Sequence, residues 1–158
     1  ISRNVNVDFE KCKFGDLCSF KYRGKSVFLL KPNTYMNLSG NAVNHWIKKE
    51  KIPLSNLLVV TDDINLPIGV LRMKKKGSDG GHNGLKNIQD LLLCSSYPRL
   101  RVGVGNEFSK GKQVDYVLGD WSQEEEEIIK QKLVTIKEMI LSFCFAGIEN
   151  TMNIFNNK

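Results

Sequence analysis

Four polar residues at three places in the sequence could handle an ester and a water molecule: Asn37, Asp62 and the adjacent pair His82 and Asn83. A histidine exchanges a proton near neutral pH, and an asparagine amide both donates and accepts hydrogen bonds. The adjacent pair therefore suits holding an ester together with its attacking water.

Two glycines, Gly80 and Gly81, directly precede His82. A helix that begins after this histidine would expose unpaired N–H groups, so the segment could approach a phosphate or a developing oxyanion closely. Each residue taken alone also has a structural explanation, because Asp62 can cap a turn and Asn37 and His82 can each cap a helix. Three such segments together favour a site.

The elements that position these residues are predicted from apolar runs and turn signals. A strand over residues 26–30 leads into the polar loop 33–37, and a strand over 57–60, expected to be covered on both faces, ends at Asp62. The basic, glycine-rich loop 74–81 leads into the helix that follows it. Ligands collect at the carboxyl ends of strands in α/β sheets, so we expect the three segments to converge.

The remaining elements alternate between strand and helix, which predicts one α/β domain. Further strands are predicted over residues 15–20, 69–74 and 99–104, and further helices over 38–50 and from Ser122, where Ser122 and Glu125 fit a capping box. The expected apolar stripe of the helix after His82 is Leu85, Ile88, Leu91 and Leu92. That of the last helix is Ile129, Leu133, Ile136, Ile140 and Phe143.

The composition is that of a globular protein. Of the 158 residues, 41% are hydrophobic and 25% are charged, which excludes disordered, collagen-like and coiled-coil chains. No apolar run approaches the ~18 residues that a membrane span requires. The net charge of +6 favours a polyanionic partner only weakly. Four scattered cysteines predict reduced thiols in a cytosolic protein: Cys12, Cys18, Cys94 and Cys144.

Several other site motifs fail when their spacing is counted. Residues 105–112 have one residue too many between their glycines for a P-loop, and residues 103–105 lack the third glycine of a dinucleotide fingerprint. The absence of a G-x-S-x-G motif argues against a serine hydrolase. With two histidines and no helical H-x-x-x-H pair, a catalytic zinc is not expected. His45 is on the polar side of its helix and is expected at the surface.

Five sequence blocks occur in the order and spacing of a known enzyme family. They are residues 31–40 (KPNTYMNLSG), 61–69 (TDDINLPIG), 80–86 (GGHNGLK), 99–105 (RLRVGVG) and 115–119 (DYVLG). In these blocks the sequence resembles bacterial-type peptidyl-tRNA hydrolase, and the resemblance covers essentially the whole chain.

The resemblance implies a monomeric, cytoplasmic enzyme with a single three-layer α/β domain, in which helices flank a mixed, twisted sheet. The reaction it implies is hydrolysis of the ester that joins a peptide to the terminal ribose of tRNA, without a metal or cofactor. The implied partner is peptidyl-tRNA, bound through its acceptor stem and CCA end, and no membrane is involved.

The site of this family maps onto residues already singled out. By the resemblance, Asn37 and Asn83 position the peptidyl-ribose end and the water, and His82 shapes the same pocket. Asp62 orients a catalytic histidine and stabilises its charged form. The residues implied in substrate or tRNA binding are Tyr35, Met36, Asn37, Asn83, Lys74 and Arg101, of which Met36 would line the pocket and Lys74 and Arg101 would lie near the 5′ phosphate of the acceptor stem.

The sequence departs from the family at its start. The family opens with a strand that ends in Gly-Asn-Pro-Gly, followed by Thr-Arg-His-Asn, whose histidine is the expected general base, and residues 1–158 contain neither segment. We expect either a truncated sequence or a homologue that has lost catalysis. Truncation is favoured because the first residue is Ile1 rather than Met and Asp62 is retained. His82, the other imidazole near the site, is an alternative base.

Two other functions stay open at this stage. A non-catalytic RNA-binding homologue would keep the basic face, although a pure binder has no reason to place Asp62 beside an anionic ligand. A small-molecule hydrolase of the same fold does not need the basic residues Lys74, Lys75, Lys76 and Arg101. These residues could instead belong to a solvated loop.

Overall fold

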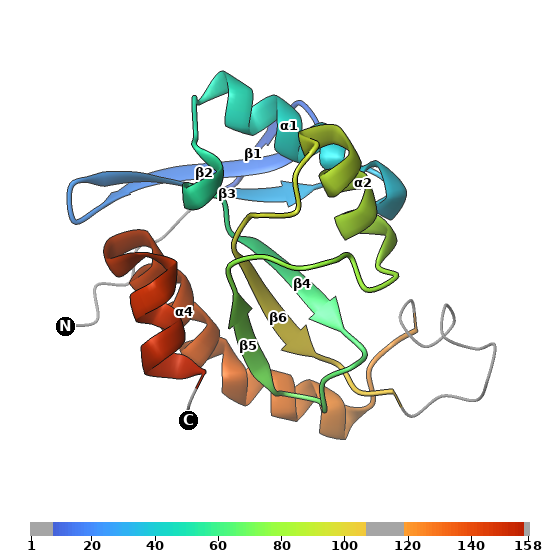
Figure 1. Cartoon of the computed structure of the whole chain (residues 1–158). Helices are drawn as coiled ribbons and strands as arrows, with labels where there is room; N and C mark the ends of the chain where they lie inside the picture. The colour runs from blue at the N-terminus through green and yellow to red at the C-terminus, as the bar shows by residue number, and fades with distance from the viewer. Residues whose placement is uncertain (1–7, 107–118, 157–158) are drawn as a thin grey trace. The chain divides into compact units, whose positions relative to one another are not determined.

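A computed structural model describes residues 8–106 and 119–156 (Figure 1). The chain divides into two compact units. The first unit is Ile1–Leu57 with Lys76–Tyr97, and the second is Leu58–Lys75 with Pro98–Lys158. Both combine strands with helices, which confirms the α/β prediction. No helix of the described ranges is long and apolar enough to cross a membrane.

The sheet of the first unit is antiparallel. It consists of β1 (Glu10–Cys12), β2 (Gly15–Tyr22) and β3 (Lys25–Pro32), in that order. The hairpin between β2 and β3 confirms the two strands predicted over residues 15–20 and 26–30. Strand β1 was not predicted, because its three mostly polar residues show no alternation.

Two helices complete the core of the first unit. The short 3₁₀ helix η1 (Met36–Leu38) runs into α1 (Ser39–Lys49), a second 3₁₀ turn, η2, spans Leu54–Asn56, and α2 is Asn83–Leu92. The predicted helices are therefore confirmed. The buried residues on their facing sides are Gly40, Ala42, Val43 and Trp46 of α1 and Gly84, Leu85 and Ile88 of α2. Leu91, expected in the stripe of α2, is 38% exposed because the buried face of this helix ends one turn earlier.

The sheet of the second unit is mixed. Its strands are β4 (Val59–Asp63), β5 (Leu71–Lys74) and β6 (Arg99–Gly103), in the order β4-β6-β5, with β4 parallel and β5 antiparallel to β6. The prediction of a strand over 57–60 covered on both faces is wrong in two respects. The strand continues through Asp62 and Asp63, and Val60 is 49% exposed because β4 lies at an edge of this sheet in the described residues.

Helix α4 (Gln123–Phe155), which has a kink at Gly147 where φ is 79°, covers the core of the second unit, and the predicted capping box is present at its start. The core contains Met73 and Leu100 from the sheet and Met139 and Phe143 from α4, with Ile136 and Ile140 beside them. Leu133, predicted in this face, is 55% exposed. Ile128 and Lys132 in the early turns lie near Gly69 instead, whereas the later positions of the predicted stripe, Ile136, Ile140 and Phe143, pack in the core as predicted.

Candidate active site

His82 is the N-cap of α2. Its Nδ1 accepts hydrogen bonds from the backbone N–H groups of Gly84 at 3.0 Å and Leu85 at 3.3 Å. Gly80 and Gly81, with φ of 61° and 84°, lead into this cap in a conformation that favours glycine. The structural explanation that the sequence left open for His82 is therefore correct, although capping does not exclude a second role for the same ring.

The cap determines which imidazole nitrogen can act on a ligand. A neutral imidazole has one donor and one acceptor nitrogen, and Nδ1 of His82 already accepts two bonds. The hydrogen-bond pattern therefore assigns the proton to Nε2, which makes that nitrogen a donor. A general base needs an accepting nitrogen, so this geometry argues against His82 as the base.

The predicted site residues of the first unit lie close together. A Cβ at Gly84 would be 2.6 Å from Sδ of Met36, which shows that the first turn of α2 abuts η1. This approach brings Met36 and Asn37 beside His82 and Asn83. Met36 is 53% exposed and Tyr35 is 82% exposed, so this part of the chain presents open surface to a ligand.

The helices α1 and α2 also lie side by side and are in close contact (Figure 1). The backbone N–H of Gly40, in the first turn of α1, donates to Oδ1 of Asn87 on α2 at 2.8 Å. A Cβ at Gly40 would lie 2.5 Å from the backbone oxygen of Asn87, so only glycine fits there. Asn87 was not singled out from the sequence, because it is 47 residues from Gly40 along the chain.

Asp62, Lys74 and Arg101 belong to the second unit. Asp62 is on one face of its sheet, and Lys74 and Arg101 are on the other. Asp62 is level with Val102 on β6, whereas Arg101 is level with Thr61 on β4. Because neighbouring residues of a strand point to opposite faces, the carboxylate of Asp62 and the guanidinium of Arg101 are on different sides. The negative charge of Asp62 therefore does not oppose an anion that binds on the basic face.

That basic face is built by the register of β5 and β6. Arg72 is opposite Arg101, and Lys74 is opposite Arg99, so the four residues share one side of the sheet, where Arg99 is buried at 3% exposure. Arg101 forms an ion pair through Nε with Asp63, a partner that the sequence reading missed. Lys75, in the loop that follows, pairs with Glu149 at 2.8 Å, which supports the solvated-loop explanation for this one lysine.

The comparisons with known proteins identify the family. The model of the family described as "Peptidyl-tRNA hydrolase" matches residues 1–158. The chain belongs to this family. Peptidyl-tRNA hydrolase of Parabacteroides distasonis is 51% identical over 155 residues, which cover 98% of this chain and 83% of the relative, and that of Bacteroides fragilis is 48% identical over 158 residues, 100% and 84% of the two chains.

The solved structures agree with these sequence relatives. The crystal structure of peptidyl-tRNA hydrolase from Acinetobacter baumannii is similar with a TM-score of 0.88 at 28% identity, over 95% of this chain and 77% of that chain. The resemblance drawn from the five blocks is thereby confirmed as a family relationship. Of those blocks, residues 115–118 lie outside the described residues, as does most of the rejected P-loop stretch 105–112.

Two other predictions concern residues outside the family's site. All four cysteines are free thiols, as predicted. His45, which was expected at the surface, is half-buried, and its ring packs edge-on against Phe14 and Trp46, with centroid distances of 5.5 and 5.3 Å. In the described parts of the chain, no group of three histidine, cysteine or acidic residues could hold a metal ion.

Proposed function

We infer that this protein hydrolyses the ester bond between peptide and tRNA in peptidyl-tRNA, and so recycles tRNA from aborted translation. The family model, the named relatives and the similar crystal structures all support this activity. The observation of the structure that carries the proposal is the apposition of η1 with the start of α2, which assembles Met36, Asn37, His82 and Asn83.

The reaction consists of attack by water on the ester carbonyl. The water oxygen bonds to the carbonyl carbon, the bond from that carbon to the ribose oxygen breaks, and the ribose leaves with its hydroxyl group restored. We propose that the amides of Asn37 and Asn83 position the ester and the water. The Nε2–H of His82 donates toward the oxygen on which negative charge develops.

Asp62 has a separate role in this proposal. It orients the general-base histidine that the family has in its Thr-Arg-His-Asn segment, and it stabilises the charged form of that ring after proton transfer. No observation on the described residues favours a binder without catalysis. The location of Asp62 on the face opposite Arg101 is consistent with a role in catalysis rather than in phosphate binding.

The phosphate contact is proposed for Lys74 and Arg101. They are diagonal neighbours on one face of β5 and β6, a spacing of about 7–8 Å that one phosphate group can bridge with long side chains. Asp63 contacts Nε of Arg101, while the two terminal nitrogens of a guanidinium carry further donors.

We also propose that the enzyme acts as a cytoplasmic monomer. Sedimentation of the purified protein would test the oligomeric state.

Adjacent carboxylates provide the test of the catalytic proposal. In the full-length enzyme, Asp62→Asn should lower kcat at least about tenfold, with tRNA affinity within threefold, because orienting a base acts mainly in the transition state. Asp63→Asn is the matched control: it removes the same charge one residue away, and it should change tRNA affinity through Arg101 more than kcat. If kcat of Asp62→Asn stays within threefold of the parent, the role assigned to Asp62 is wrong.

A further inference from the structure

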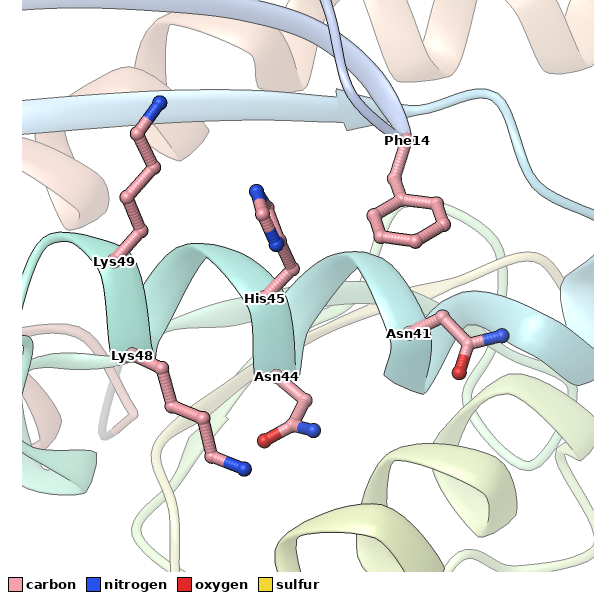
Figure 2. A pocket seen from close by; sticks show the side chains of 6 residues that line it. All are labelled: Phe14, Asn41, Asn44, His45, Lys48 and Lys49. Carbon is pink, nitrogen blue, oxygen red and sulfur yellow. The ribbon is translucent and has the colours of Figure 1, made fainter.

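A cavity in the first unit, open to solvent, is lined by residues other than those assigned to the reaction (Figure 2). Its volume is about 560 Å³, and it opens between the turn that joins β1 to β2 and the outer face of α1. The lining residues are Phe14, Asn41, Asn44, His45, Lys48 and Lys49. The five residues from α1 have helical spacing, which puts them on one face, and none of the six is a carboxylate.

Phe14 is held rigidly at one end of the cavity. Its φ is 69°, a conformation that is uncommon for a residue other than glycine. Its carbonyl accepts a hydrogen bond from the N–H of Asn33 at 3.1 Å, and the carbonyl of Lys13 accepts one from Nε1 of Trp46 at 2.9 Å. Backbone strain persists only where the surroundings fix it, and it is frequent at ligand sites. The turn therefore presents a preorganised ring to the cavity.

The rings and cations of this region form a continuous row. His45 lies between Phe14 and Trp46, edge-on to both. Lys13 Nζ is 5.2 Å from the centroid of Phe14, and Lys49 Nζ is 4.3 Å from that of Trp46. Positive charge interleaved with aromatic faces is the combination that binds single-stranded nucleic acid, since phosphates need cations and every base has a face to stack.

We propose that this cavity binds one unpaired nucleotide of the RNA part of the substrate. Lys48 takes its phosphate, Phe14 contacts its base, and the amides of Asn41 and Asn44 serve the polar edge of the base. The proposal rests on the proposed function for the source of the RNA. Along the chain, Lys48 follows Asn37 by 11 residues, roughly 16 Å of helix, so one RNA strand can reach both places.

The test measures binding of a short unstructured RNA oligonucleotide, labelled with a fluorophore, over a salt series. Lys48→Ala should weaken binding at least about fivefold and reduce the salt slope by about 0.7, because one phosphate contact is lost. Phe14→Asn should weaken binding by a similar factor, because the base loses its aromatic contact. Asparagine is chosen because it tolerates a positive φ.

Controls separate this site from the active site and from a general attraction of anions. Lys21→Ala removes one exposed charge from β2 of the same unit and should bind the oligonucleotide like the parent. Hydrolysis of a short aminoacyl-ribose ester by Lys48→Ala and Phe14→Asn should equal that of the parent. Tripolyphosphate binding should respond to Lys48→Ala but not to Phe14→Asn.

The outcomes distinguish the cavity from the proposed function. Oligonucleotide binding that is unaffected by both cavity variants overturns the proposal, even in an enzyme that hydrolyses peptidyl-tRNA. Sensitivity to Lys48→Ala without sensitivity to Phe14→Asn also overturns it, because the site would then take phosphate alone. Sensitivity to both variants in a protein without hydrolytic activity would support the cavity and refute the function.

Discussion

Replacing His82 tests the assignment of its two ring nitrogens. His82→Ala removes both hydrogen bonds that Nδ1 accepts from the first turn of α2, at 3.0 and 3.3 Å. Loss of an N-cap costs about 1 kcal/mol, which for a protein of this size lowers Tm by roughly 2–4 °C. His82→Asn supplies an oxygen where Nδ1 stands, so it should restore most of that stability. Neither variant has a donor at the place of Nε2.

The two variants should therefore differ in stability and agree in catalysis. If the Nε2–H group stabilises the developing oxyanion, both should lose turnover, by up to the 10²–10³-fold that removal of one such donor costs. Thermal unfolding and single-turnover hydrolysis of peptidyl-tRNA measure the two effects separately. Imidazole ¹⁵N chemical shifts of the parent should show the proton on Nε2.

Three results would refute this reasoning. A proton found on Nδ1 would contradict the cap. Equal Tm values for His82→Ala and His82→Asn would mean that the cap contributes no stability. Turnover of His82→Asn equal to that of the parent would remove the Nε2 donor from the mechanism.

Two further predictions concern the basic face and the contact between the helices. Lys74→Ala and Arg101→Ala should each weaken tRNA binding and lower its salt slope by about one unit while leaving hydrolysis of a short aminoacyl-ribose ester unchanged; equal losses on both substrates would show instead that these residues support the fold. Asn87→Ala should lower both Tm and turnover because the N–H of Gly40 loses its acceptor, at a cost of about 1–3 kcal/mol, and Asn87→Asp, which retains an acceptor oxygen, should recover both. Equal losses in the Ala and Asp variants would contradict the role of that bond.

Local patterns were enough to predict most helices and strands. The capping box of Ser122 and Glu125 predicted the start of α4. Apolar runs and turn signals predicted the strands over residues 15–20 and 26–30, which form a hairpin. These features depend on residues close together in the chain, where spacing alone decides the conformation. The candidate residues of the first unit were found for the same reason, since η1 and the start of α2 each follow a local turn signal.

Features that depend on distant residues could not be predicted. The ion pair between Asp63 and Arg101 joins positions 38 apart, and the side chain of Asn156 forms two hydrogen bonds of 2.9 Å with the backbone of Met73, 83 positions away. The contact of His45 with Phe14 was not predicted because Phe14 comes from another element. Leu133 was misplaced because the residues covered in the early turns of α4 depend on Gly69, a distant position in the chain.

Two glycines of the first unit allow its candidate site residues to lie close together. Two helix starts approach each other at Gly84 beside Met36 and at Gly40 beside Asn87, and a Cβ at either glycine would lie less than 3 Å from its neighbour. A glycine within a helix costs about 1 kcal/mol relative to alanine, so each position gives up stability that a side chain would provide. What the fold gains is contact between η1 and the first turn of α2. The position of Asn37 relative to Asn83 therefore depends on this close backbone packing between η1 and α2.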